Sequence, residues 1–194
     1  MKVGHRRDDR SVPQGLLDDP KLEQVAAWGK RLAGSGLSPG ESGNLSCRVE
    51  DGFLITCTGV PLASIEREHW VLVTGIDRSS GGEVVVASRG PAEPSRDAAV
   101  HATLYGRCPE ASAVYHLHVG HLDELQGRLG VPSTGTYYQA GTRESVEEIE
   151  RFLDGHPGSR YFVLVDHGIV AWGESIDEAG GLVEAHQQAL AEGG

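Results

Sequence analysis

Apolar residues recur along the chain with two spacings, and these predict helices and short strands in alternation. A spacing of three or four residues is typical of a helix, whereas alternation or a short β-branched run indicates a strand. We predict helices over residues 20–34, 96–105, 145–153 and 176–190, and strands over residues 45–49, 52–56, 70–74, 83–87, 113–119 and 161–165. Turn residues separate these elements at 79–82 and in a glycine-rich loop over 127–141. The pattern predicts an α/β or α+β domain built on a mostly antiparallel sheet.

Two serines mark predicted helix starts. Ser95 and Ser175 each stand just before a predicted helix, where a serine side chain accepts a hydrogen bond from a free backbone N–H. Before the first helix, residues 1–19 are polar and charged, and we expect them to form a flexible arm. Residues 20–194 are long enough for one domain with a core and too short for two.

The charge balance of the chain excludes some classes of binding partner. It has 17 basic and 28 acidic side chains, a formal net charge of -11. A nucleic-acid backbone or an anionic membrane surface would be repelled, so we expect neither as a partner. A small phosphorylated substrate stays compatible, because local donors can outweigh a distant net charge. We see no signal peptide and no apolar run of transmembrane length.

The three cysteines, Cys47, Cys57 and Cys108, are an odd number and show no CxxC spacing. A disulfide framework would need paired cysteines, so a reducing compartment is the simpler interpretation. We therefore expect a cytoplasmic protein.

His116 and His118 are the most informative pair of residues in the sequence. Residues two apart on a strand project from the same face, so both imidazoles can reach one metal ion. His167 follows the apolar predicted strand 161–165 and precedes a glycine, which makes it the candidate third ligand. An isolated HxH pattern is more often structural than metal-binding, and His121 lies close enough to be a decoy or a supporting residue.

Five segments in chain order carry a resemblance to a known family. They are Ser42-Gly43-Asn44-Leu45-Ser46, Leu54-Ile55-Thr56-Cys57-Thr58-Gly59, Pro94-Ser95-Arg96-Asp97 with His101, His116-Leu117-His118, and Asp166-His167-Gly168 followed by Ala171-Trp172-Gly173. Together they resemble the class II aldolase/adducin family, whose members include fuculose-phosphate aldolase, ribulose-phosphate epimerase and methylthioribulose-phosphate dehydratase. The resemblance runs from about residue 25 to the end of the chain.

The resemblance implies a fold, a metal and a set of site residues. The fold would be three-layered, with a mostly antiparallel central sheet flanked by helices. His116, His118 and His167 would hold a divalent ion, most often Zn²⁺, with Mn²⁺, Co²⁺ or Fe²⁺ as alternatives. The phosphate-binding positions would be Asn44, Thr58, Gly59 and Ser95, and backbone N–H groups of glycine turns and hydroxyls near a helix start do suit an anion.

The Pro-Ser-Arg-Asp segment departs from the family's Pro-Ser-Ser-Glu. The resemblance implies that the acid, here Asp97, moves a proton during catalysis, but its side chain is one methylene shorter than glutamate. Asp97 could instead stabilise a helix start or pair with His101 one turn later. Arg96 replaces a serine and adds a cation that can grip a phosphate or a carboxylate.

The segment that carries the catalytic tyrosine of the aldolases looks missing between His118 and the Gly-Thr-Arg-Glu sequence at 141–144. Tyr137 and Tyr138 lie close by in the sequence, and we expect one of them to act as a proton donor. Tyr115 is adjacent to His116 and points to the opposite face of its strand, so we discount it.

We consider three functions. The first is a lyase that cleaves a small hydroxylated carbonyl compound, such as a sugar phosphate, by a retro-aldol reaction through a metal-stabilised enediolate. The second is a dehydratase, an epimerase or another metalloenzyme, including an iron enzyme. The third is a non-catalytic, adducin-like interaction module, against which the retention of all three histidines argues.

The resemblance also implies a homotetramer with active sites at subunit interfaces. Apolar strand edges and the loop over residues 131–140 need cover. That loop contains Tyr137 and Tyr138, and aromatic residues with polar tips are typical of interfaces. We therefore expect this loop to contact a neighbouring subunit.

Overall fold

The computed structural model of the chain describes residues 4–8, 10–78 and 84–193. Within these residues the core is an eight-stranded sheet in the order β1-β5-β4-β3-β2-β6-β8-β7. The strands are β1 (Gly4–Asp8), β2 (Asn44–Val49), β3 (Gly52–Thr56), β4 (Trp70–Asp77), β5 (Val85–Arg89), β6 (Ala113–Leu117), β7 (Tyr161–Leu164) and β8 (Gly168–Gly173). Every neighbouring pair is antiparallel except β1 and β5, which are parallel.

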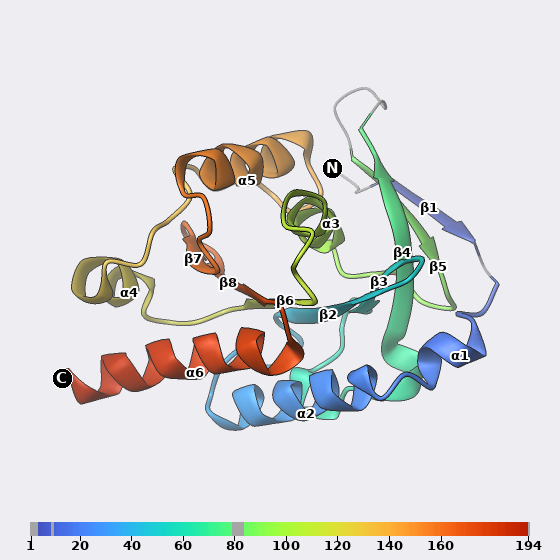
Figure 1. Ribbon diagram of the computed structural model, residues 1–194, viewed down its shortest axis with the longest axis horizontal. Coiled ribbons are helices and arrows are strands. Elements are labelled where there is room, and N and C mark those ends of the chain that lie inside the picture. The colour runs from blue at the N-terminus through green and yellow to red at the C-terminus, as the bar shows by residue number, and fades with distance from the viewer. Residues whose placement is uncertain (1–3, 9, 79–83, 194) are drawn as a thin grey trace.

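Helices cover both faces of the sheet, as Figure 1 shows. They are α1 (Gln14–Leu17), α2 (Lys21–Gly34), α3 (Ala98–Arg107), α4 (Leu122–Leu129), α5 (Arg143–Gly155) and α6 (Ile176–Glu192). Helices α3 and α5 lie on one face, and α1, α2 and α6 lie on the other. The three-layer, mostly antiparallel fold predicted from the sequence is confirmed.

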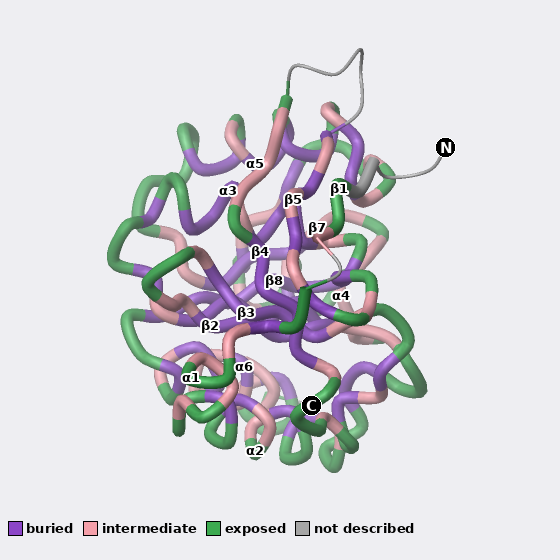
Figure 2. Tube along the Cα trace, turned by 90° about the vertical axis from the view of Figure 1, so that its right-hand side faces the viewer, coloured by how far each residue is buried: buried purple, intermediate pink, exposed green. Residues whose placement is uncertain are grey.

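The two-residue period of the strands divides the core into two halves. Leu45, Tyr115 and Leu117 face the layer of α2 and α6, whereas Ile55 and Val114 face α3 and α5. The middle of the molecule is consequently buried between the helix layers (Figure 2). Because successive side chains point to opposite faces, each central strand contributes side chains to both halves of the core. Polar residues on such a strand are therefore held in place by packing on both sides.

The N-terminal segment differs from the flexible arm that we expected. Residues 4–8 form β1, which pairs with β5 in register from Gly4 opposite Val85 to Asp8 opposite Arg89. Val12 is buried, 3% exposed, and lies close to Gly90. Pairing with a distant strand supplies the backbone hydrogen bonds that this polar segment could not make alone.

The predicted loop over residues 127–141 also needs correction, because its first residues complete α4. This helix buries one side chain, Leu125, and ends at Gly130 in a left-handed conformation with φ 64°. One buried residue gives too weak a periodicity to predict. Strand β8 was likewise missed, and the predicted turn over 79–82 lies outside the described residues.

Helix α3 begins at Ala98, two residues later than predicted, with Asp97 rather than Ser95 at its N-cap. Ser175 does cap α6, because its side chain accepts a hydrogen bond from the N–H of Glu178. Among the described helices, none combines the length and the apolar composition that crossing a membrane would require.

Candidate metal centre and active-site cleft

The three candidate ligand histidines come from the end of β6 and from the turn that precedes its neighbour β8. His116 lies within β6 and His118 directly follows it, whereas His167 lies in the turn between β7 and β8. In that turn the His167 N–H donates to the Leu164 carbonyl at 3.0 Å, and Asp166 adopts φ 56°. Gly168 comes next, and a Cβ there would stand 2.4 Å from the Leu117 carbonyl oxygen. Only glycine lets β8 approach β6 this closely beside the histidines.

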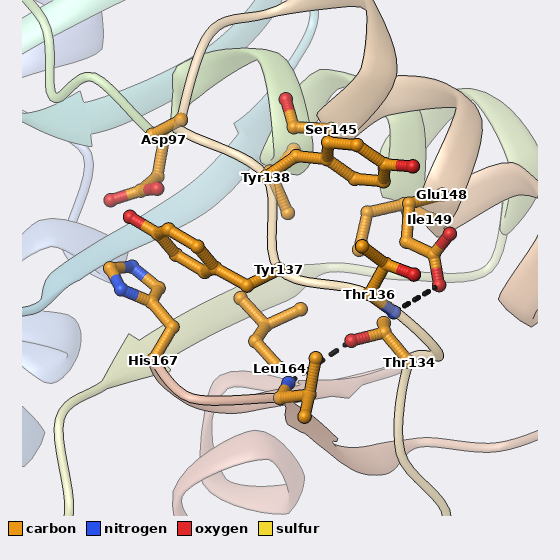
Figure 3. A pocket seen from close by; sticks show the side chains of 13 residues that line it. Asp97, Thr134, Thr136, Tyr137, Tyr138, Ser145, Glu148, Ile149, Leu164 and His167 are labelled. Carbon is orange, nitrogen blue, oxygen red and sulfur yellow. Dashed lines mark hydrogen bonds between the residues drawn. The ribbon is translucent and has the colours of Figure 1, made fainter.

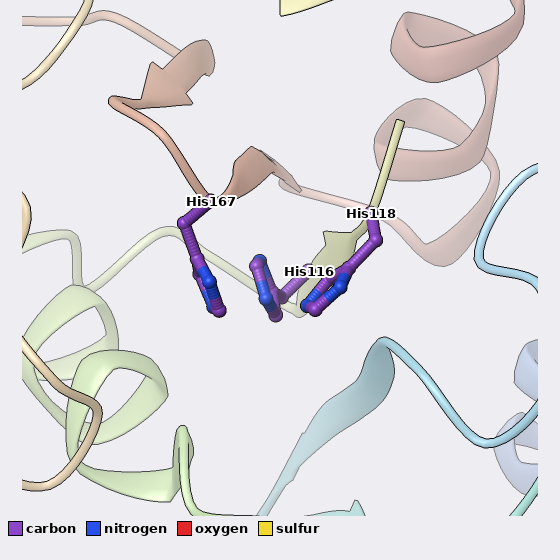
Figure 4. Close-up of side chains that lie close together, drawn as sticks. All are labelled: His116, His118 and His167. Carbon is purple, nitrogen blue, oxygen red and sulfur yellow. The ribbon is translucent and has the colours of Figure 1, made fainter. Parts of the chain in front are cut away.

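The imidazole rings converge on one point, as Figure 4 shows. Ring centroids are separated by 5.0 Å for His116 and His118, 4.9 Å for His116 and His167, and 4.7 Å for His118 and His167. Each residue offers one ring nitrogen, and these nitrogens lie within 4.8 Å of one another. Ser38 holds the end of β6 here, since its Oγ accepts the His118 N–H at 2.8 Å.

A hydrogen bond fixes which ring nitrogen of His116 is free. His116 Nδ1 lies 3.0 Å from the Ile169 carbonyl, so it must carry the proton, and Nε2 keeps its lone pair. Within the described residues, Nε2 of His116 and Nε2 of His167 are buried without a hydrogen-bond partner. Burial lowers the pKa of His116, although Asp97 opposes the shift. Burial likewise lowers the pKa values of His118 and His167.

These residues fit a divalent metal ion. Neutral imidazoles are the form that binds a metal, and a backbone carbonyl on the far ring nitrogen is the usual support for such a ligand. Three nitrogen donors with open positions on the cleft side match a catalytic rather than a closed structural site.

Asp97 lies at the same centre despite its short side chain. Its Oδ2 is 3.8 Å from His116 Nε2 and accepts a hydrogen bond from Asn44 Nδ2 at 2.8 Å. Burial raises the pKa of Asp97, but the positive charge that His116 and His167 carry when protonated, together with the Asn44 hydrogen bond, lowers it, and the net direction is downward. The carboxylate is therefore ionised and able to accept a proton.

His101 does not pair with Asp97. Its Nδ1 lies 2.7 Å from Ser46 Oγ, which also lies 2.8 Å from Tyr105 Oη. Burial lowers the pKa of His101 to about 3. His101 is thus a neutral residue of the buried layer beneath the site.

The expected phosphate-binding positions line one open cleft of about 500 Å³, which also contains His118, His167 and Tyr137. The predicted positions found there are Asn44, Thr58, Gly59, Ser95, Arg96 and Asp97. The turns meet because the Thr58 N–H donates to the Glu93 carbonyl at 3.0 Å and the Ser95 N–H to the Thr56 carbonyl at 3.2 Å. Gly59 adopts φ 81°, which suits glycine.

Asn44 has a different hydrogen-bonding capacity from the other cleft residues. Its N–H is already bonded to Asp97, and its Oδ1 is buried without a partner among the described residues. An unpartnered acceptor suits a hydroxyl donor better than a phosphate oxygen.

The two candidate tyrosines point in different directions (Figure 3). The Tyr137 ring lies over His167, with centroids 5.5 Å apart, and its hydroxyl points toward Asp97. The Tyr138 side chain instead points toward Ser145 and Glu148. It lines a small inner pocket of about 30 Å³ next to the cleft. The structure thus brings Tyr137, and not Tyr138, to the histidines.

Three residues near the site escaped the sequence analysis. Ser38 supports His118, Glu41 lines the cleft, and Glu148 is buried beneath the segment that carries Tyr137. The helical spacing in the sequence could have revealed Glu148, since it lies between Ser145 and Ile149 on the buried face of α5. A carboxylate in such a position needs a partner.

Known proteins resemble this chain along most of its length. A sequence model of the family described as Class II Aldolase and Adducin N-terminal domain matches residues 23–192. The L-fuculose phosphate aldolase of Escherichia coli O6:H1 is 28% identical over 160 residues, which cover 74% of this chain and 68% of that protein. The 3-oxo-tetronate 4-phosphate decarboxylase of Haemophilus influenzae is 26% identical over 185 residues, 84% of this chain and 82% of that protein.

A dehydratase and a solved structure complete the comparison. The methylthioribulose-1-phosphate dehydratase of Methylococcus capsulatus is 27% identical over 197 residues, which cover 87% of this chain and 92% of that protein. The crystal structure of L-fuculose-1-phosphate aldolase from Thermus thermophilus superimposes with a TM-score of 0.66 at 23% identity, covering 88% of this chain and 90% of that one. The chain belongs to the class II aldolase and adducin family.

Proposed function

We propose that this protein is a metal-dependent lyase that cleaves a small phosphorylated hydroxycarbonyl compound by a retro-aldol reaction. The observation that carries the proposal is the convergence of His116, His118 and His167 beside the ionised Asp97, at one cleft. Class II aldolases typically depend on a divalent metal ion, which agrees with this donor set.

The three histidines would hold the ion, for which imidazole ligands favour Zn²⁺ over Mn²⁺, Co²⁺ or Fe²⁺. Such an ion supplies a Lewis acid that polarises a carbonyl oxygen of the substrate. The buried β6 and the turn before β8 hold the ligand side chains in place, so little reorganisation is needed when the substrate enters.

Residues of this chain would transfer the proton and bind the phosphate of the substrate. Asp97 accepts the proton of the substrate hydroxyl, because its carboxylate is ionised and next to the ligand cluster. Tyr137, whose hydroxyl points toward Asp97, protonates the leaving fragment. Thr58, Gly59, Ser95 and Arg96, which line the same cleft, bind the phosphate.

Dehydration or decarboxylation of a related phosphorylated compound is the second candidate. The dehydratase and the decarboxylase relatives cover 87% and 84% of this chain, against 74% for the aldolase relative. We propose the same three histidines and the same Asp97 carboxylate for either of these reactions.

Metal analysis joined to a substrate screen tests the proposal. We expect about one divalent ion per chain, lost for the most part when His116, His118 or His167 is changed singly to alanine. His121→Ala is the matched control, since His121 is nearby in the sequence and lies outside the three-histidine cluster. Full metal content in two of the three ligand variants would contradict the metal site.

The screen should include ketose phosphates, aldonate-type 3-oxo acid phosphates and methylthio-substituted analogues. Released aldehyde, released carbon dioxide and loss of water distinguish the three reactions. If inorganic phosphate does not compete with the active substrate, the anionic end is a carboxylate rather than a phosphate.

A further inference from the structure

The segment that carries Tyr137, residues 130–142, is called the tyrosine segment below. Its first part is fixed to the edge of the sheet at β7. The Val163 N–H donates to the Pro132 carbonyl at 2.9 Å, and the Thr134 N–H donates to the Val163 carbonyl at 3.0 Å. The Val165 N–H donates to Thr134 Oγ1 at 3.1 Å. The segment therefore reaches the site with a fixed starting point.

Glu148 provides the next attachment, from α5. Its Oε1 accepts the Gly135 N–H at 2.6 Å and the Thr136 N–H at 3.2 Å. Its Oε2 pairs with the guanidinium of Arg151. Glu148 is 5% exposed, so these are charge-assisted hydrogen bonds in a site with little water, where they are strong.

A third attachment follows the tyrosines. Thr142 Oγ1 donates to the Gln139 carbonyl at 2.8 Å, and the same oxygen accepts the Ser145 N–H at 3.2 Å as the N-cap of α5. Among the described residues, Tyr137 and Tyr138 make no hydrogen bonds of their own. Their positions are consequently set by the attachments on either side.

We infer that Glu148 is a positioning residue that holds the tyrosine segment so that Tyr137 covers His167 with its hydroxyl directed at Asp97. The hydrogen bond from the Thr136 N–H to Glu148 lies one residue from Tyr137. The hydrogen bond to the Gln139 carbonyl lies two residues away. The catalytic consequence rests on the proposed function, whereas the structural attachment does not.

The burial of Glu148 supports this role over a purely helical one. A carboxylate on the apolar face of a helix is costly unless it is fully paired, and α5 could place an apolar residue there. The two N–H groups belong to the tyrosine segment and not to α5. The buried carboxylate is thus matched to the segment, and its loss would leave two backbone N–H groups without their acceptor.

The first test needs no substrate. Glu148→Ala is compared with Glu147→Ala, in which the adjacent and exposed glutamate of the same helix is removed. Hydrogen exchange at the Gly135 and Thr136 amides should accelerate roughly tenfold or more in Glu148→Ala, because hydrogen bonds to charged groups are strong enough for that factor. Fluorine NMR of protein labelled with 3-fluorotyrosine, with the Tyr137 resonance assigned through Tyr137→Phe, should show this resonance shifted and narrowed. Unchanged exchange and an unchanged resonance would overturn the inference.

The second test uses the substrate found in the screen. Glu148→Ala should lower kcat by roughly tenfold to a hundredfold, since a displacement of about 1 Å can cost that much, and change KM little. In a Tyr137→Phe background the same change should have almost no further effect on kcat. Glu148→Gln keeps an Oε1 acceptor for both N–H groups, so it should retain most of the activity, and it serves as the folded variant if alanine destabilises the chain.

The outcomes separate the two proposals. Additive losses of kcat in the double variant would refute the positioning role even if the enzyme is a lyase. Faster amide exchange and a displaced Tyr137 resonance in a protein that turns over none of the screened compounds would support the attachment and count against the proposed function.

Discussion

Asp97 stands where the family's motif carries glutamate, and the backbone around it accounts for the reach of the shorter side chain. Helix α3 begins at Ala98, so Asp97 is the N-cap and lies outside the helical spiral. Its carboxylate can then turn toward His116 and Asn44. The substitution of the motif residue therefore preserves a carboxylate beside the three histidines.

Asp97→Asn tests the proton-transfer role while keeping the shape of the side chain. We expect turnover to fall by about a hundredfold or more, because a general base typically contributes that much. Metal content should stay at the wild-type level, since the ligands are histidines. A rate equal to that of the wild type would leave Asp97 with a structural role at the start of α3.

The residues of the centre differ in how well the sequence predicts them. His116 and His118 could be predicted from their two-residue spacing and the family's motif. His167 could be predicted from the motif and from its place between an apolar strand and a glycine. Tyr138 could not be separated from Tyr137, because the direction of a loop side chain depends on attachments from distant residues. Glu148 and Ser38 act through backbone N–H groups, and no motif marks such contacts.

At the scale of elements, two helix caps offer a matched comparison. Thr142→Ala and Ser175→Ala each remove a side chain that accepts an N–H at the start of a helix. Each should lower the free energy of unfolding by about 1 kcal/mol, measured by urea denaturation. Thr142 also holds the Gln139 carbonyl, so only Thr142→Ala should lower kcat as well. Equal effects on kcat would show that the α5 cap does not influence Tyr137.

Element prediction from the sequence succeeded where periodicity was strong. The bounds of β3 agreed with the prediction, and those of α2 and α6 agreed to within two residues. It failed for β1, because the partner strand β5 lies far away in the chain, with Gly4 opposite Val85. It failed for α4, because only Leu125 is buried. Local pattern cannot reveal an element that tertiary contacts stabilise.

At the scale of the whole molecule, His101 contributes to the pH dependence of stability. Its pKa is about 3 in the folded chain, against an ordinary value of 6.5, because burial disfavours the charged form. Between these values the unfolded chain binds a proton that the folded chain does not, so the free energy of unfolding falls as the pH drops from 6.5 toward 3. One such proton changes the free energy of unfolding by about 1.4 kcal/mol per pH unit.

Urea denaturation of the metal-free protein at several pH values between about 6.5 and about 4 measures this contribution. His101→Asn should reduce the pH slope by the share of one proton, whatever its effect on absolute stability. An identical slope in the variant and the wild type would mean that His101 is protonated in the folded state.

Assembly is the remaining prediction at this scale. We propose a homotetramer in which the tyrosine segment contacts a neighbouring subunit near its metal centre. Tyr137 is 47% exposed in the single chain, which is unusual for a large aromatic side chain and is typical of an interface. Light scattering at low protein concentration measures the mass. A fully active monomer would refute both the tetramer and the proposed interface at the tyrosine segment.

Strand β1 affects how a molecular mass measured by light scattering should be interpreted. It occupies the backbone groups of β5 that would otherwise form an open edge of the sheet. A chain shortened before Val12 would expose that edge as a template for strand addition by another molecule. Its aggregates would grow by strand exchange and would lack a closed symmetry. A single defined mass from the intact chain would reflect association through the tyrosine segment. A broad distribution of masses from the shortened chain would reflect association through the exposed edge of β5.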